Sequence, residues 1–242
     1  MKTAIVIPAR RGSTRLKDKL LLKVKDKPVI AYTVENCLKV RNIDRVIVAC
    51  DDDEFKEVLK EYPIDVILTP SDIQSGSDRI AYVIKDLDYD FIVNVQADEP
   101  LLNPVDIEKV AVALKDYPIT TLAYPITEEE DYLNPNVVKV VLDRENCGIY
   151  FSRSPIPFYR DIDFNTLKNL KYPLKHIGIY GYRKDVLLNF AYSMEKSPIE
   201  EIEKLEQLRL LYNGYKIKIF IASKDTIGID TKEDFERFCT LI

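Results

Sequence analysis

The fold class follows from one short stretch near the start of the chain, Thr3-Ala-Ile-Val-Ile-Pro8. It is a continuous apolar run that leads into a polar loop, which is typical of a strand buried on both faces of a parallel sheet. Similar runs recur in the first half of the chain, at residues 45–49, 65–69 and 91–95. Helical patterns alternate with them, at residues 29–40, 52–61, 78–85 and 103–114. This alternation predicts an α/β fold with a mostly parallel sheet and helices on both faces.

The pattern changes beyond residue 125. Strand-like segments now follow one another with long connections and no helical pattern between them, at residues 137–142, 148–151 and 176–180. We therefore expect one α/β domain over residues 1–242, with a β-rich lobe inserted at residues 130–183.

A helical pattern returns near the end of the chain. A capping box at Ser197 starts one helix, and Gly214 ends it as a left-handed cap. Glu206 and Gln207 interrupt the apolar stripe of this helix, so one of them must point toward the core, unless both are ordinary exposed residues. A further strand and a last helix capped by Thr231 complete the chain.

Composition excludes several classes of protein. The 35 basic and 40 acidic residues give a net charge of −5, so the basic excess of a nucleic-acid-binding protein is missing. No window approaches 18 uncharged apolar residues, and we expect no membrane span. The four cysteines lie far apart and there is one histidine, which argues against zinc and His-rich metal sites. We expect a cytoplasmic protein with free thiols.

The loops that follow the strands are where chemistry is expected, because ligands of open parallel sheets bind beyond the carboxyl ends of the strands. The first such loop, Pro8-Ala-Arg-Arg-Gly-Ser-Thr-Arg15, leads to Lys19 and offers backbone N–H groups, two hydroxyls and four cations. A triphosphate needs this combination, although a solvated basic loop is the alternative. The spacing matches neither a Walker motif nor GxGxxG.

Carboxylates follow later strands. Asp98 and Glu99 come directly after the run at 91–95, and such a pair suits a hard cation such as Mg²⁺, with a turn cap as the alternative role of Asp98. Asp230, taken by itself, is typical of a turn residue beside the Thr231 cap.

Two further segments allow more than one interpretation. The triplet Asp51-Asp-Asp53 mimics the DxD metal motif of glycosyltransferases, but acids before a helix favour stabilisation of its N-terminus through the helix dipole. The segment Ser75-Gly-Ser-Asp-Arg79 is a Gly-containing loop that could bring backbone close to a planar base.

Taken together, these segments resemble the 3-deoxy-manno-octulosonate (Kdo) cytidylyltransferases. The motifs recur in the family's order from residue 4 to about residue 234: Ile7-Pro-Ala-Arg10, Ser13-Thr-Arg-Leu16 with Lys19, Gln74-Ser-Gly-Ser-Asp-Arg79, Asn94-Val-Gln-Ala-Asp-Glu-Pro100, Asn134–Val141, Tyr150–Pro157, His176–Tyr180, Glu203–Arg209 and Gly228–Thr231. The chain departs from the family at a few positions: Lys17-Asp18 replaces Pro-Gly, Leu20 a Pro, Ala97 a Gly and Ser77 a Thr.

The resemblance implies a Rossmann-like nucleotide-diphosphosugar transferase sheet. It also implies the transfer of CMP from CTP to the anomeric hydroxyl of Kdo, with release of pyrophosphate, for lipopolysaccharide synthesis. The catalytic set would be Asp98, Lys19, Arg10 and Asp230, with Mg²⁺ held by Asp98 and Asp230.

The resemblance further assigns binding residues by position. For the nucleotide these are Pro8, Ala9, Arg10, Lys19, Gln74, Ser75, Gly76 and Arg79. For the sugar they are Gln96, Arg153, His176, Tyr180, Glu206 and Gln207, although a lone histidine is as often structural. A homodimer contact through residues 130–183 is expected, both by analogy with the family and because exposed strand edges need cover.

Other activities remain as alternatives. One is another sugar-activating nucleotidyltransferase, such as an N-acylneuraminate cytidylyltransferase or a hexose-1-phosphate enzyme. A metal-dependent glycosyltransferase that uses Asp51 to Asp53 is a second alternative, and a non-catalytic nucleotide sensor is a third.

Overall fold

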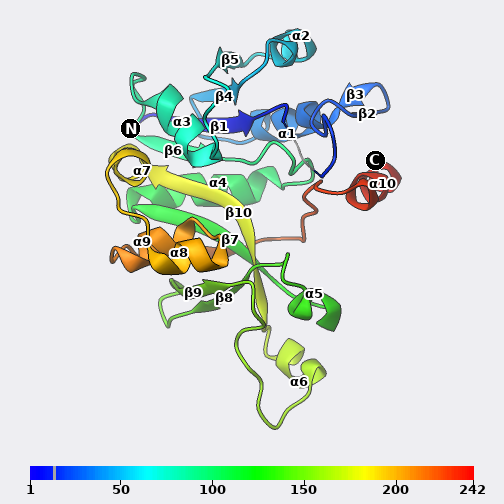
Figure 1. The fold of residues 1–242 in the computed structure, drawn as a ribbon, viewed down its shortest axis with the longest axis vertical. Helices are drawn as coiled ribbons and strands as arrows, with labels where there is room; N and C mark the ends of the chain where they lie inside the picture. The colour runs from blue at the N-terminus through cyan, green and yellow to red at the C-terminus, as the bar shows by residue number, and fades with distance from the viewer. Residues whose placement is uncertain (13–14) are drawn as a thin grey trace.

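The computed structural model describes residues 1–12 and 15–242, and in this part of the chain nine strands form one sheet (Figure 1). Its main path runs in the order β11, β7, β10, β6, β1, β4, β5. The strands of this path are β1 (Thr3–Ala9), β4 (Arg45–Cys50), β5 (Asp65–Leu68), β6 (Phe91–Asn94), β7 (Ile119–Pro125), β10 (Leu174–Arg183) and β11 (Lys218–Ile221). The hairpin β8 (Lys139–Leu142) and β9 (Gly148–Ser152) extends the sheet from β10, and β2 (Lys23–Val24) pairs separately with β3 (Lys27–Pro28).

The prediction of a mostly parallel sheet is confirmed. The first half of the chain supplies β1, β4, β5 and β6, which pair in parallel. Among the described strands of the main path, β10 is the exception, because it runs antiparallel to both β6 and β7. Six apolar or small residues of β1 and the polar Thr3 are all buried, as a strand covered on both faces requires.

Helices cover both faces of the sheet, and β1 shows how the sequence divides between them. Ile5 and Ile7 pack into one apolar cluster with α1 (Val29–Leu38) and α4 (Pro104–Val112). Ala4 and Val6 point the other way, into a cluster with α3 (Gly76–Ile84), α7 (Lys184–Tyr192) and α9 (Gln207–Tyr212). The remaining helices are α2 (Glu54–Leu59), α5 (Glu129–Leu133), α6 (Phe164–Asn169), α8 (Pro198–Glu203), α10 (Lys232–Leu241) and a short 3-10 turn at Ala113–Lys115.

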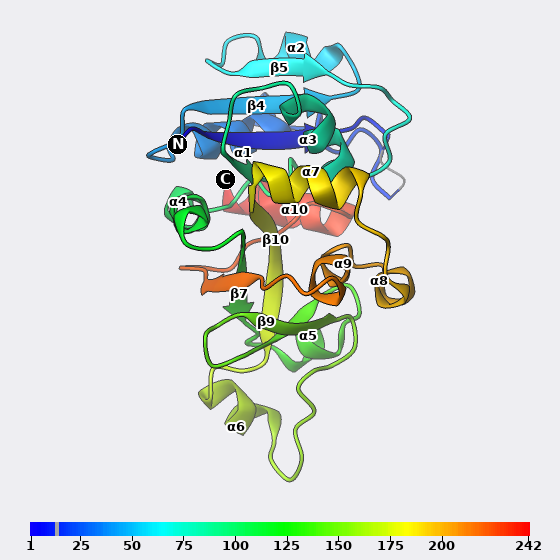
Figure 2. The same ribbon diagram turned by 90° about the vertical axis from the view of Figure 1, so that its left-hand side faces the viewer.

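The first part of the segment predicted as an inserted lobe, which holds β8, β9 and α6, lies at one end of the molecule (Figures 1 and 2). Its last part, Leu174–Arg183, is β10, which lies within the main sheet between β7 and β6. Its hairpin is not a separate sheet, since β8 pairs with the start of β10. The expectation of no helix in this segment was wrong, because α6 stands between β9 and β10. Asp163 starts that helix by accepting a hydrogen bond from the Thr166 N–H at 2.8 Å, a cap that the sequence contained.

The single helix predicted from Ser197 to Gly214 is also wrong. Lys204 adopts a left-handed conformation, with φ of 54°, and this breaks the segment into α8 and α9. The ends fit the prediction: Ser197 forms a capping box with Glu200, and Gly214 follows α9 with φ of 81°. The break matters because Glu206 and Gln207 follow it directly.

Two further predictions concern the chain as a whole. Cys37, Cys50, Cys147 and Cys239 are all free thiols, as expected. Within the described residues we find no helix with the length and apolar character that crossing a membrane requires.

Candidate active site

A cavity of about 300 Å³ opens at the carboxyl ends of β1 and β6, beside the first turn of α3. The residues predicted to bind nucleotide all line it: Pro8, Ala9, Arg10, Lys19, Gln74, Ser75, Gly76 and Arg79. Arg15, Leu20, Gln96, Ala97, Asp98 and Asp230 complete the wall. The hydroxyls of Ser13 and Thr14, which the sequence suggested for the triphosphate, lie outside the described residues.

Asp98 and Asp230 meet at this cavity, although they are far apart in sequence. The Lys19 ammonium lies 2.5 Å from Asp98 Oδ2 and 2.7 Å from Asp230 Oδ1. Arg15 approaches the other oxygen of Asp230 at 3.0 Å. Burial lowers the pKa of Lys19, but the two carboxylates outweigh that effect and hold the pKa above its usual value. The lysine is therefore a charged ammonium between two carboxylates.

Backbone contacts explain why the two acids meet. The N–H of Ile229 donates to the carbonyl of Asp98 at 2.9 Å, which ties the segment before Asp230 to the turn after β6. Side chains of α1 form hydrogen bonds with the same turn: Thr33 donates to the Ala97 carbonyl at 2.9 Å, and Asn36 donates to the Pro100 carbonyl at 2.8 Å. The position of Asp98 is thus set by the sheet, by α1 and by the distant C-terminal segment.

Glu99 takes a different place from Asp98, which corrects the idea that the adjacent pair serves one cation. Glu99 is not among the described residues that line the cavity, and its carboxyl lies against Gly228, where an added Cβ would stand 3.3 Å from Oε1. Its Oε2 is buried and has no hydrogen-bond partner among the described residues. Burial raises the pKa of Glu99 to about 8, and the charge of Asp98 adds to this.

Arg79 is a wall residue with its guanidinium already engaged. The side chain is buried and donates to Thr69 Oγ1 and, at 3.0 Å, to the Ile73 carbonyl. It thereby fixes the loop between β5 and α3, while a role in binding phosphate stays a prediction.

The acidic triplet before α2 holds the basic loop and the helix start. Asp51 accepts a hydrogen bond from the Arg11 N–H at 3.0 Å, and Asp52 contacts the Arg11 guanidinium at 3.1 Å. Asp52 also accepts from the N–H of Glu54, the first residue of the helix, at 2.8 Å. This geometry supports the helix-terminus interpretation over a DxD metal motif.

A second cavity, of about 220 Å³, adjoins the first, and Gln96 lines both. Five of the six residues predicted to bind sugar lie in its wall, namely Gln96, His176, Tyr180, Glu206 and Gln207. The wall also contains residues that the sequence motifs do not assign to the sugar: Ser77, Asn94, Val138, Gly178, Tyr182, Lys204 and Leu205. Asn94 ends β6 and Ser77 lies in the first turn of α3, and both belong to motifs named above. Their place at a strand end and at a helix start is the feature of the sequence that could have predicted them as site residues.

His176 is held in its neutral form. Its Nε2 lies 3.0 Å from the Thr121 hydroxyl, and that hydroxyl donates to the Ile179 carbonyl at 2.6 Å. Since a hydroxyl has one proton to donate, we infer that Nε2 carries the imidazole proton and that Nδ1 is left as an acceptor. Burial lowers the pKa of His176 to about 3.

Tyr180 brings a polar group into the wall of the second cavity. Its hydroxyl is buried and has no hydrogen-bond partner among the described residues. A buried hydroxyl without a partner is costly in the folded protein, so a ligand with hydroxyl groups would satisfy it.

Arg153 is the sugar-site residue that the structure places differently. Its side chain donates to the carbonyls of Glu203 at 2.8 Å and Pro135 at 3.1 Å, and it is not among the described residues that line the second cavity. Lys139, which is fully buried, supports the same region by donating to the Arg153 carbonyl at 2.6 Å. Arg153 therefore clamps the end of α8, and its contact with substrate stays a prediction.

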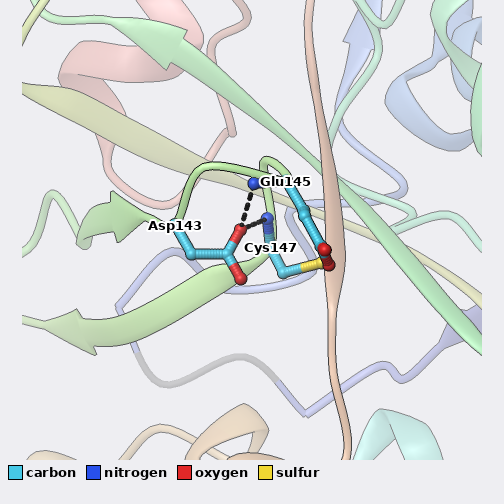
Figure 3. Close-up of side chains that lie close together, drawn as sticks. All are labelled: Asp143, Glu145 and Cys147. Carbon is cyan, nitrogen blue, oxygen red and sulfur yellow. Dashed lines mark hydrogen bonds between the residues drawn. The ribbon is translucent and has the colours of Figure 1, made fainter.

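A third group of potential ligands lies away from both cavities, in the turn between β8 and β9 (Figure 3). One oxygen of Asp143 accepts hydrogen bonds from the N–H groups of Glu145 and Cys147, both at 2.8 Å. The Glu145 carboxylate pairs with Lys216 at 3.0 Å. These contacts account for the cluster as a tight turn.

Comparison with known proteins identifies the family. The model of the cytidylyltransferase family matches residues 4–219. A 3-deoxy-manno-octulosonate cytidylyltransferase of Francisella philomiragia is 45% identical over 240 residues, covering 96% of this chain and 95% of the relative. The enzyme of that name from Geobacter metallireducens is 42% identical over 246 residues, covering 98% and 96%.

Solved structures agree with this assignment. A CMP:2-keto-3-deoxy-manno-octonic acid synthetase complexed with CTP superimposes with a TM-score of 0.90 at 37% identity, covering 100% of this chain and 98% of the other. A 4-diphosphocytidyl-2C-methyl-D-erythritol synthase from Anaerococcus prevotii, with a TM-score of 0.67 at 16% identity, shares the fold alone. The chain therefore belongs to the cytidylyltransferase family and is a nucleotidyltransferase.

Proposed function

We propose that the chain transfers CMP from CTP to the anomeric hydroxyl of Kdo and releases pyrophosphate. The observation that carries the proposal is the pair of adjoining cavities joined at Gln96, one lined by cations and the other by polar groups suited to a hydroxylated acid. The names of the relatives and the CTP bound in the similar structure support the choice of both substrates.

The transfer itself asks mainly for alignment and charge stabilisation. Arg10, Arg15 and Lys19 line the first cavity and would bind the phosphates, since charge-assisted hydrogen bonds to phosphate are strong. The backbone of the α3 start, at Ser75 and Gly76, would face the base. Gly76 leaves room there, because an added Cβ would stand 3.3 Å from the ring of Pro8.

Mg²⁺ is the cofactor we propose, held by Asp98 and Asp230. The donor set fits, because two carboxylates converge on one cationic group, the Lys19 ammonium, at 2.5 and 2.7 Å. A bound Mg²⁺ would polarise the α-phosphate and lower the pKa of the attacking hydroxyl. Lys19 would then exchange its carboxylate partners for phosphate oxygens, which keeps every charge paired.

The second cavity would orient the sugar. Gln96 stands between the two cavities, so it would contact the reacting end of the sugar acid. The unpartnered Tyr180 hydroxyl, the neutral His176 ring and the Glu206 and Gln207 side chains offer donors and acceptors for the sugar hydroxyls.

The test is pyrophosphate release from CTP with different sugars. We expect turnover with Kdo and Mg²⁺, and little or none with N-acetylneuraminate or a hexose 1-phosphate. Turnover with neuraminate and not with Kdo would replace the proposed substrate. CTP binding without any turnover would instead indicate a nucleotide sensor.

We also propose a homodimer that forms through residues 130–183. Large apolar side chains stand exposed in this segment, with Phe158 85%, Leu170 63% and Ile149 59% accessible. A subunit contact over this segment would remove these apolar side chains from water. Light scattering should give twice the chain mass of 28.0 kDa, and a mass of one chain would overturn the dimer.

A further inference from the structure

The first turn of α3 separates the two cavities, and its successive residues face different sides. Ser75 and Gly76 line the first cavity, whereas Ser77 lines the second. Ser75 is engaged as the helix cap, accepting from the Asp78 N–H at 3.0 Å. The Ser77 side chain, by contrast, belongs to the wall of the proposed sugar cavity.

Ser77 contacts a residue that lies far along the chain and lines the same cavity. Its buried hydroxyl donates to Glu206 Oε2 at 2.9 Å. Glu206 lies two residues after the left-handed Lys204 and directly before α9, so its backbone belongs to the junction between α8 and α9. The hydrogen bond therefore ties this junction to the helix whose start lines the nucleotide cavity.

The hydrogen bond from Ser77 affects the protonation of Glu206. Burial raises the pKa of its carboxyl, the Asp78 carboxylate raises it further, and the hydrogen bond from Ser77 opposes both effects. The positive charge of Arg209 lowers the pKa of Glu206, and the negative charge of Glu200 raises it. The hydroxyl thus favours the ionised form that accepts hydrogen bonds from a sugar.

We propose that Ser77 is a positioning residue for the transfer reaction, which holds the Glu206 carboxylate against the start of α3 so that the sugar and nucleotide cavities stay aligned. The inference rests on the proposed function. It concerns a residue at which the family motif carries threonine, a side chain that offers the same hydroxyl.

The experiment compares Ser77→Ala with Ser77→Thr in steady-state kinetics. We expect Ser77→Ala to raise KM for Kdo about tenfold, the typical loss of a hydrogen bond to a charged group, and to leave KM for CTP within about twofold. In the profile of kcat/KM for Kdo against pH, the acidic limb of this variant should move to higher pH. The reason is that Glu206 loses a hydrogen-bond donor that favours its ionised form. Ser77→Thr should restore wild-type values, and the exposed Ser71→Ala should match wild type throughout.

A double-mutant cycle with Glu206→Ala decides whether Ser77 acts through Glu206. We expect Ser77→Ala to add little in the Glu206→Ala background, since the acceptor of its hydrogen bond is already absent. The same tenfold loss in that background, or a lowered Tm that threonine does not rescue, would overturn the inference. Wild-type protein that makes no CMP-Kdo would instead overturn the proposed function, whereas active wild type with an unaffected Ser77→Ala would overturn this inference alone.

Discussion

The ammonium of Lys19 lies 2.5 Å from a carboxylate oxygen of Asp98, and both residues line the first cavity. On its other side it reaches Asp230 at 2.7 Å. The lysine therefore bridges the two carboxylates and occupies the space between them. Phosphates that entered the cavity would compete for the lysine, and a divalent cation would compete for the acids. On the proposed assignment of Mg²⁺ to Asp98 and Asp230, nucleotide and metal binding would be linked through this one side chain.

Replacement of Asp98 by Asn should remove activity without unfolding the protein. We expect kcat/KM to fall by more than about 100-fold, near 3 kcal/mol, the scale of a lost charge contact in the transition state. Lys19 keeps Asp230 as a partner, so Tm should move by less than about 3 °C. Pyrophosphate release and a thermal melt measure the two effects, with the exposed Asp116→Asn as the matched control. A variant that melts far below wild type would indicate a structural acid.

Replacement of Lys19 by Met should tighten divalent-cation binding in the absence of nucleotide. The change removes the ammonium that competes for Asp98 and Asp230, so we expect Mn²⁺, followed by electron paramagnetic resonance, to bind about tenfold more tightly. In wild type, CTP should produce a similar gain by engaging Lys19.

Lys17→Met is the control for this effect. It removes the same charge from the same loop at an exposed position. An equal gain in Lys17→Met would assign the effect to net charge, and an unchanged affinity in Lys19→Met would remove the proposed competition.

His176 should stay neutral throughout the physiological pH range. Because it is the one histidine of the chain, its imidazole resonances are assigned without ambiguity. Burial lowers its pKa to about 3, so we expect no titration between pH 8 and 5 in the folded protein. In urea the same resonance should titrate near pH 6.5. A folded-state midpoint near 6.5 would contradict the buried ring.

The free energy of unfolding should depend on pH because His176 has a pKa of about 3 in the folded protein and about 6.5 in the unfolded chain. Below pH 6.5 the unfolded chain takes up a proton at His176 that the folded protein refuses until about pH 3. This group therefore contributes stability above pH 6.5, and that contribution falls by about 1.4 kcal/mol per pH unit below it.

Replacement of Arg153 by Lys distinguishes a structural clamp from a substrate contact. Lysine cannot reach both carbonyls that Arg153 holds, at Glu203 and Pro135, so we expect a loss of about 1–2 kcal/mol in the free energy of unfolding. Tm should fall by about 2–8 °C in a chain of this size, while the exposed Arg160→Lys should not change it. A raised KM for Kdo with an unchanged Tm would indicate that Arg153 contacts the sugar and would contradict a purely structural role.

Several elements of the chain were predictable because their signals are local. The apolar run in β1, the Asn103 cap before α4 and the Thr231 cap before α10 each act within a few residues. The break at Lys204 was not predictable, because no glycine or proline marks it and an ordinary lysine adopts the left-handed conformation there. The apolar periodicity of the sequence continues through Lys204, and it therefore predicted one helix where the structure has α8 and α9.

Within the site, the sequence predicted which residues lie together better than it predicted what each one contacts. Motif order brought Asp98 and Asp230 together correctly, as their shared contact with Lys19 demonstrates. It could not reveal that Glu99 lies against Gly228, or that the Ser77 hydroxyl reaches Glu206. Such contacts depend on side-chain direction, which adjacency in sequence does not determine.

The sequence by itself determined the alternation of strands and helices, the parallel sheet and the family, because each follows from local patterning and from motifs in a set order. Only the tertiary structure decided which charges neutralise one another and which polar groups are buried without a partner. Electrostatic and hydrogen-bonding energies depend on distances of a few ångströms between residues that lie far apart along the chain, and those distances exist only once the chain has folded.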